Sequence, residues 1–194
     1  MMTGNIDVQS TGQEALNGTN KIFESNDYNF RVQMLTAADM DWCIAMQRDQ
    51  PLHYRLPWNL AGGALDDPDA FSFSFKILDA VQRPAGACIC HFCPATFEAP
   101  AILDVEMIQN FHIQDSLLDG NTLRFALYVL ILFMADTQCT GLRLLSPVNE
   151  TVADYYLQEH QFSDLTGGLK EVLYRDAADL YEWFKADTTQ VDDE

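Results

Sequence analysis

Two acidic residues on a predicted strand are the first candidates for chemistry in this sequence. Asp104 and Glu106 are two residues apart within the segment 101–113, which is long enough for a strand that bends or holds a bulge. If Val105 and Met107 pack into the core, both carboxylates point to the opposite face. Either carboxylate could then take a proton from an ammonium group or a bridging water. The alternative is a solvated face of a sheet.

Two adjacent tyrosines are the candidate proton donors. Tyr155 and Tyr156 lie in a predicted helix that begins after Asn149 and ends near His160. A phenol, with an ordinary pKa of about 10, can donate a proton to a strong base. A tyrosine in an amphipathic helix can equally pack with its hydroxyl at the edge of the core.

The run Cys88-x-Cys90-His91-x-Cys93 raises the question of a metal site. On a strand, Cys88 and Cys90 face one way and His91 the other. A zinc site would need a pair of ligands on a turn and a second pair elsewhere. We therefore predict no metal site and interpret these cysteines as small buried apolar side chains.

The elements that must position these residues alternate between strand and helix patterns. Strands are predicted at 30–35, 73–81, 87–92, 101–113, 142–148, 162–165 and 169–174. Helices are predicted from Thr36 onward, at 122–138, at 149–160 and at 177–185. This order predicts a mixed sheet covered by helices, an α/β (α+β) fold.

The order over residues 29–175 resembles the GNAT acetyltransferase superfamily. Gly86 matches the glycine that often opens the third strand of that family, and Ile108-x-x-Phe111-x-Ile113 is similar to the end of its fourth strand. The segments 142–149 and 153–162 are similar to its fifth strand with a terminal Asn and to the helix that follows. The resemblance implies a mostly antiparallel sheet of six or seven strands, splayed between strands 4 and 5, with an extra C-terminal helix.

The resemblance also implies a cofactor, acetyl-CoA, held where a glycine loop enters the long helix. Unpaired N–H groups and the helix dipole bind the pyrophosphate there. The family pattern is Gln/Arg-x-x-Gly-x-Gly/Ala, of which only Gly120 is in place; Leu117 and Thr122 replace the outer positions, and Asp115 and Asp119 add negative charge. The implied cofactor-binding residues are Ile108, Phe111, Ile113, Leu118, Asp119, Gly120, Asn121, Thr122, Asn149 and Tyr155. Asn121 and Thr122 are also suitable helix caps.

The family's chemistry implies roles for the candidates above. Glu106 or Asp104 would be the general base, acting through water, and Tyr156, or next Tyr155, would protonate the departing thiolate. The aromatic loop 51–58 falls where the family builds its acceptor pocket. There His53, Tyr54 and Trp58 could stack on a cationic acceptor, or Trp58 could simply anchor the loop.

Bulk composition limits the partners. The formal charge of −18 and pI near 4.2 argue against nucleic acid and anionic membranes and favour a cationic small molecule or a basic protein segment. The chain shows no secretory signal, and an odd number of cysteines is typical of reduced thiols, so we expect a cytoplasmic protein. The family often forms homodimers, although the sequence does not fix the oligomeric state.

Three segments are expected along the chain: a polar, flexible tail at 1–27, a single domain at 28–186 and an acidic tail at 187–194. We predict an acyl-CoA-dependent N-acyltransferase that moves an acetyl group directly to an amine. The incomplete glycine loop leaves a second hypothesis, a catalytically weak or inactive module of the same fold that binds a ligand or a protein. An acidic mimic of nucleic acid is a third, resting on charge alone.

Overall fold

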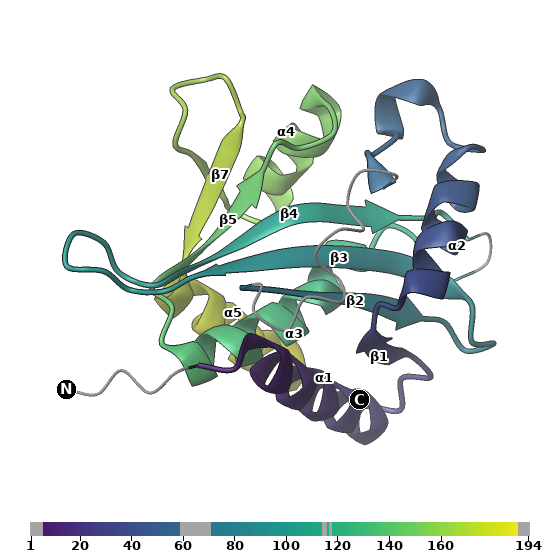
Figure 1. Cartoon of the computed structure of the whole chain (residues 1–194), viewed down its shortest axis with the longest axis horizontal. Helices are drawn as coiled ribbons and strands as arrows, with labels where there is room; N and C mark the ends of the chain where they lie inside the picture. The colour runs from purple at the N-terminus through teal and green to yellow at the C-terminus, as the bar shows by residue number, and fades with distance from the viewer. Residues whose placement is uncertain (1–5, 59–70, 114–115, 117, 190–194) are drawn as a thin grey trace.

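The computed structural model describes residues 6–58, 71–113, 116 and 118–189, and its elements are those expected of an α/β chain (Figure 1). The helices are α1 (Val8–Ser25), α2 (Ala37–Gln47), the short 3-10 helix η1 (Leu52–Tyr54), α3 (Thr122–Thr137), α4 (Glu150–Glu159) and α5 (Ala177–Thr189). The strands are β1 (Arg31–Met34), β2 (Ser72–Leu78), β3 (Pro84–Cys93), β4 (Ile102–Asn110), β5 (Gly141–Leu145), β6 (Ser163–Asp164) and β7 (Val172–Asp176). None of the described helices is both long and apolar enough to cross a membrane.

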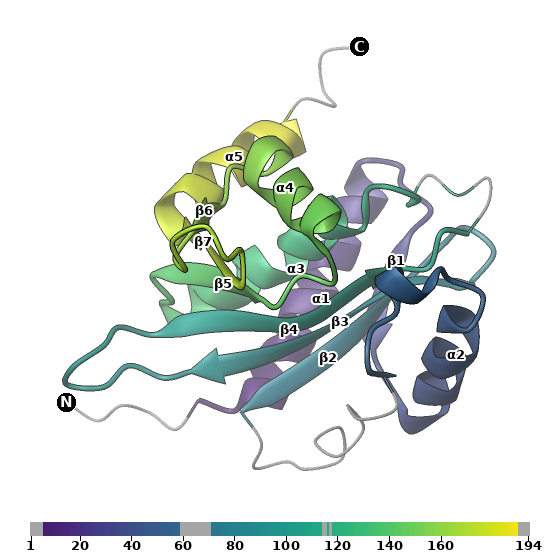
Figure 2. The same ribbon diagram turned by 90° about the horizontal axis from the view of Figure 1, so that it is seen from above.

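The strands form one seven-stranded sheet in the order β1-β2-β3-β4-β5-β7-β6. Every neighbouring pair is antiparallel except β4 and β5, which run parallel. Helices α1, α3 and α5 lie on one side of this sheet, and α2 and α4 lie on the other (Figures 1 and 2). The predicted fold class is confirmed.

The sheet opens between β4 and β5. Their pairing runs from Ile102 opposite Gly141 to Val105 opposite Leu144, and β4 then continues to Asn110 without this partner. A bulge lies at the same place, because the register with β3 steps from Cys90 opposite Val105 to Ile89 opposite Met107. The extra residue is Glu106. A bulge bends its strand and re-aims the side chains beside it, so it assists this opening.

Helix α3 forms the centre of the core beneath the sheet. Its residues from Phe125 to Leu130 are at most 2% exposed. This burial agrees with the sequence of the helix, which is apolar on every side. The Phe133 ring stacks on Phe73 of β2 at 4.6 Å between centroids. The position of the α3 N-terminus beside the opening is therefore fixed by the core itself.

The expected flexible tail at 1–27 is wrong, because residues 8–25 form helix α1, which packs against α3, β1 and β2. The buried residues are Val8, Gly12, Ala15, Leu16, Thr19 and Phe23, which recur every three or four positions. This is the spacing of an amphipathic helix, hidden in a segment whose overall composition is polar.

The expected acidic tail from 187 onward is also wrong at its start. Helix α5 extends to Thr189, and the Asp187 carboxylate accepts hydrogen bonds from Arg124 Nε at 3.0 Å and from the Tyr128 hydroxyl. Residues 190–194 lie outside the described residues. Asp187 is therefore a structural partner of α3 rather than a solvated tail residue.

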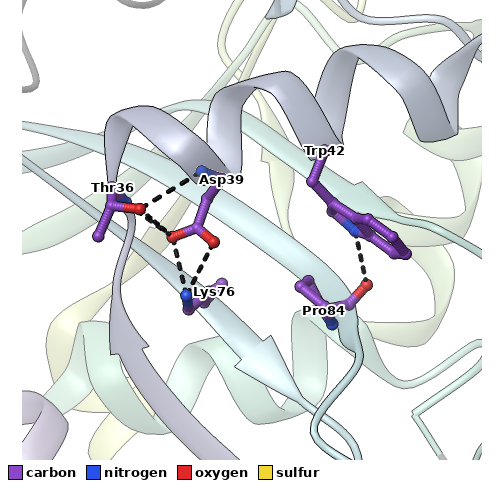
Figure 3. A network of polar contacts seen from close by, with 5 residues as sticks. All are labelled: Thr36, Asp39, Trp42, Lys76 and Pro84. Atoms are coloured by element: carbon purple, nitrogen blue, oxygen red, sulfur yellow. Dashed lines mark hydrogen bonds and ion pairs between the residues drawn. The ribbon is translucent and has the colours of Figure 1, made fainter.

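Helix α2 is docked on the sheet by two polar contacts (Figure 3). Thr36 caps the helix as predicted, in a capping box with Asp39. Both oxygens of the Asp39 carboxylate also accept a hydrogen bond from Lys76 Nζ, each at 2.8 Å. The Trp42 indole donates to the Pro84 carbonyl at 3.3 Å. These contacts hold α2 on the sheet and so constrain the segment after it, which reaches the opening.

Candidate functional site

A cavity of about 340 Å³ lies at the opening of the sheet. Its lining comes from the end of β4, the start of α3, helix α4 and the segment after α2. The lining residues include Tyr54, His112, Gly120, Thr122, Tyr155 and Tyr156. Its position matches the place at which the resemblance puts the cofactor.

The start of α3 gives this cavity the properties of an anion site. The N–H groups of a first helical turn have no partners inside the helix, and the dipole adds partial positive charge. Gly120 has φ +78°, and a Cβ atom there would meet nothing within 4 Å, so the backbone borders open space. The Thr122 Oγ1 atom is buried and has no hydrogen-bond partner among the described residues. An oxygen-rich ligand at this position would supply one.

Gly86 explains how the helix start comes so close to the sheet. A Cβ atom at this position of β3 would lie 2.7 Å from Thr122 Cγ2 and 3.3 Å from the Gln109 carbonyl oxygen. Only glycine leaves room for that approach. The expected cap is not made, however, because Asn121 occupies the N-cap position without a side-chain capping bond. The first-turn N–H groups are thus not masked by that side chain.

The loop between β4 and α3 is braced by its own polar residues. Asp119 Oδ1 accepts from Asn110 Nδ2 at 3.1 Å and lies 2.8 Å from His112 Nδ1. The His112 amide donates to Asn110 Oδ1 at 2.8 Å, which supports its left-handed backbone at φ +50°. The carboxylate expected to repel a phosphate is therefore engaged by histidine. Leu117 and Asp115 lie outside the described residues.

A smaller chamber of about 30 Å³ adjoins the cavity, and Tyr156 borders both spaces. Glu106 lines this chamber, at the bulge, together with Val105, Met107 and Leu144. Burial raises the pKa of the Tyr156 phenol, whose side chain is 9% exposed. Neither the Tyr156 hydroxyl nor the exposed Glu106 carboxylate has a hydrogen bond or an ion pair within the described part of the chain. Both groups are free to meet a ligand.

Tyr155 is placed differently from its neighbour. Its hydroxyl donates to the Gly120 carbonyl at 3.4 Å and lies 3.1 Å from His160 Nε2. Burial raises the pKa of Tyr155 and lowers that of His160 to about 4. Tyr155 therefore ties α4 to the glycine loop, and His160 is neutral near neutral pH.

Asp104 does not share the surroundings of Glu106. Its buried carboxylate forms a two-point ion pair with Arg143 of β5, at 2.6 Å and 2.8 Å, and accepts from Cys93 Sγ. The expectation of two equivalent carboxylates on one face is wrong, because the bulge interrupts the alternation after Val105. Of the two base candidates, only Glu106 lines the chamber.

Several predicted ligand residues lie elsewhere. The side chains of Phe111, Ile113 and Leu118 are buried in the core and do not line the cavity. Trp58 is fully buried and donates its indole N–H to Gln109 Oε1, so it anchors the loop and cannot stack on an acceptor. His53 is exposed outside the cavity, whereas Tyr54 lines it.

Asn149 caps α4 by accepting from the Val152 amide at 2.9 Å, as predicted, and its amide donates to the His53 carbonyl at 3.0 Å. It therefore links α4 to the segment after α2. The cavity residues that the sequence reasoning missed include Val148, Thr151 and Val152. The signal was available for Thr151 and Val152, because they precede Tyr155 by four and three residues and so share its face of helix α4, whereas Val148 precedes the helix.

A third hollow, of about 520 Å³, lies between the start of α4 and the β6–β7 loop. It shares Ser146 and Pro147 with the small chamber. Its acidic members include Glu150 and Glu171, and Lys170 Nζ lies 2.9 Å from Glu150 and 2.6 Å from Asp154. The small chamber, which Glu106 and Tyr156 line, thus shares lining residues with both larger spaces.

Comparison with solved structures identifies the architecture. AtaTR bound with acetyl-CoA matches 81% of this chain and 99% of its own, with a TM-score of 0.59 at 16% sequence identity. An acetyltransferase of the GNAT family from Staphylococcus aureus Mu50 matches 76% of this chain and 99% of its own, with a TM-score of 0.55 at 10% identity. The fold is that of a GNAT acetyltransferase.

A further GNAT-fold match is a mutant of the spermidine N-acetyltransferase SpeG from Vibrio cholerae, with a TM-score of 0.52 at 11% identity over 80% of this chain and 98% of that one. No protein-family model matches the sequence, and no curated protein matches it. At these identities the likeness establishes the fold.

The comparisons correct one expectation drawn from charge. Similar structures include the AtaT–AtaR complex bound to DNA and a KacTA–DNA complex. Proteins of this fold therefore do occur in nucleic-acid complexes, and the exclusion of nucleic acid from the net charge of −18 is wrong. Net charge sums over the whole surface, so it does not decide what one patch, or an associated chain, contacts.

Proposed function

We propose that this GNAT-fold protein is an N-acetyltransferase that transfers an acetyl group from acetyl-CoA directly to an amine. The observation that carries the proposal is the cavity at the β4–β5 opening together with the small chamber that shares Tyr156 with it. The cavity has the features of an anion site, and the chamber has an available carboxylate and an available phenol. Acetyl-CoA supplies the acetyl group as an activated thioester.

The residues at the start of α3 fit the cofactor. The first-turn N–H groups and the open backbone at Gly120 suit a diphosphate, and the unpartnered, buried Thr122 hydroxyl can donate to a phosphate oxygen. The exposed edge of β4 beyond Val105 has no β5 partner, so its backbone groups are available to the pantetheine arm. The apolar lining around Ile108 and Val148 suits that arm as well.

Glu106 is the proposed general base. It accepts a proton from the attacking amine, directly or through a water molecule, as the nitrogen forms its bond to the acetyl carbon. The bulge at Glu106 aims this side chain into the chamber while Asp104 remains paired with Arg143. One carboxylate therefore has a catalytic role and the other a structural role.

Tyr156 is the proposed general acid. Burial raises its pKa, which keeps the phenol protonated near neutral pH. Its unpartnered hydroxyl can then donate the proton to the thiolate sulfur as the carbon–sulfur bond breaks. Glu106 and Tyr156 therefore carry the two proton transfers of one direct displacement.

The third hollow is the proposed acceptor entrance. It shares the lining residues Ser146 and Pro147 with the small chamber and none with the cavity at the start of α3. Glu150 is paired with Lys170, whereas the Glu171 carboxylate has no ion pair within the described part of the chain and favours an acceptor that carries a positive charge besides its reacting amine. A polyamine or a lysine side chain on a basic segment has this character.

Isothermal titration with acetyl-CoA tests the cofactor site. We expect a dissociation constant on the order of micromolar and loss of binding in Gly120→Trp, which fills the open space. Gly167→Trp is the matched control, because Gly167 also has a positive φ (+64°) and nothing within 4 Å of a Cβ atom, but does not line the cavity. Equal losses in both variants would show that backbone strain, rather than cavity filling, is responsible.

A second assay tests the chemistry. Thiol release from acetyl-CoA is measured with a panel of polyamines and lysine peptides. We expect Glu106→Gln to lower kcat about a hundredfold or more, the usual contribution of general base catalysis, and Asp104→Asn to act mainly on stability. No acetyl-CoA binding by the wild type would leave the alternative, a binding module of the same fold.

A further inference from the structure

The proposed diphosphate site lacks an ordinary cation. Among the described residues that line the 340 Å³ cavity there is no lysine or arginine, and His112 is the side chain that can become positively charged. Arg124 lies in the first turn of α3, but its guanidinium is bonded to Asp187 of α5, 3.0 Å away. A diphosphate here would rely on helix N–H groups unless His112 contributes.

The geometry of His112 is fixed by three contacts. Its Nδ1 atom lies 2.8 Å from Asp119 Oδ1, and its amide is held by Asn110, which also bonds Asp119. An ionised carboxylate only accepts hydrogen bonds, so Nδ1 carries a proton. The second ring nitrogen, Nε2, has no partner among the described residues. A histidine oriented in this way by a carboxylate is prepared to bind a ligand through its other nitrogen.

We propose that His112 binds the diphosphate of coenzyme A as an imidazolium, so that cofactor binding takes up a proton. This inference rests on the proposed function. With Nδ1 already protonated, a neutral ring presents a bare Nε2 lone pair, which repels phosphate oxygens. Only the doubly protonated ring can donate a charge-assisted hydrogen bond from Nε2. The diphosphate therefore binds better to the charged form, and linkage requires proton uptake on binding.

The other groups that face His112 do not supply this proton. Asp119 is the carboxylate in contact with the ring, with Oδ1 at 2.8 Å from Nδ1. Across the cavity, α4 presents Tyr155 and, behind it, His160 and the nearby Glu159; burial raises the pKa of Tyr155 and lowers that of His160 to about 4. The segment after α2 contributes Gln50 and Tyr54, which carry no charge. Among the described groups that line the cavity, His112 is thus the one that can take up a proton and then donate from Nε2.

Calorimetry on the intact wild-type protein tests this directly. Acetyl-CoA is titrated near neutral pH in a series of buffers with different ionisation enthalpies, and the slope of the binding enthalpy gives the number of protons taken up. We expect net uptake with acetyl-CoA and with dephospho-CoA, which keeps the diphosphate. S-acetylpantetheine, which has no diphosphate, should bind weakly and without uptake.

Two variants assign the proton. His112→Asn suits the left-handed backbone, because asparagine tolerates a positive φ, and we expect it to bind acetyl-CoA about tenfold more weakly or worse and to lose the uptake. His91→Asn on β3, outside the cavity, is the control and should keep both. Binding by the wild type without proton uptake, or unchanged uptake in His112→Asn, would overturn this inference alone. Absence of any acetyl-CoA binding would overturn the proposed function with it.

Discussion

Replacing Gly86 by alanine tests how tightly the start of α3 is held against the sheet. The new Cβ atom would lie 2.7 Å from Thr122 Cγ2 and 3.3 Å from the Gln109 carbonyl oxygen. Neither neighbour is the free end of a flexible side chain. Overpacking of this kind costs about 1–3 kcal/mol, while the reduced backbone entropy of the unfolded chain returns about 0.5–1 kcal/mol. We expect a net loss of about 0.5–2 kcal/mol and weaker acetyl-CoA binding, because the helix start must move.

Urea denaturation measures the loss, and a second substitution shows whether the methyl contact causes it. Thr122→Ser removes Cγ2 and by itself should cost about 0.8 kcal/mol, one buried methyl group. The double variant should lose about 1 kcal/mol less of its free energy of unfolding than the two single variants lose in total. Additive losses, or a Gly86→Ala variant as stable as the wild type, would refute the argument.

Gly18 of α1 provides the matched glycine control. A Cβ atom there would lie 3.0 Å from Leu132 Cδ1, the far end of a flexible side chain that can shift. Alanine is favoured over glycine inside a helix by about 1 kcal/mol. Gly18→Ala should therefore keep or raise the stability, unlike Gly86→Ala.

Three further predictions concern single side chains. Tyr156→Phe should lower kcat with little change in acetyl-CoA affinity, and an unchanged kcat would remove Tyr156 from the mechanism. Asp187→Ala should lower the free energy of unfolding by about 1–3 kcal/mol, since it leaves the hydroxyl of the buried Tyr128 without its acceptor. Glu182→Ala, which breaks an exposed pair with Lys185, should change it by less than about 0.5 kcal/mol. Hydrogen bonds from Thr166 and from backbone amides lower the pKa of Asp164 from 3.8 to about 2, so its bracing of the β6–β7 loop is complete above about pH 4 and is lost as the pH falls toward 2. The protection of the Gly168 amide, the ratio of its intrinsic exchange rate to the observed rate at the same pH, should fall in that interval, and Asp164→Asn should show low protection at every pH.

Local patterns predicted most elements of this fold. The apolar run of α3, the hairpin of β2 and β3 and the cap of α4 at Asn149 each depend on neighbours in sequence, so period and capping residues were sufficient. Helix α1 was missed although its buried residues are correctly spaced. Its polar composition hid that spacing, and only contact with α3 shows what the apolar stripe covers.

The candidate site likewise has features that local sequence predicts and features that depend on tertiary contacts. The sequence placed a carboxylate and a phenol near one opening, and it placed Gly120 before a helix start, because strand and helix order carry that information. The choice between Asp104 and Glu106 depended on the bulge in β4 and on Arg143, which comes from another strand. Trp58 likewise took its place from Gln109, a partner that only folding brings near.

The amino-acid sequence by itself determined the order of elements, the buried central helix and the glycine at its entrance, since these follow from local periodicity and backbone freedom. Tertiary structure alone decided which acidic group faces the chamber and which aromatic residues became core. Those outcomes are set by strand register and by pairs of residues distant in sequence, which no local pattern encodes.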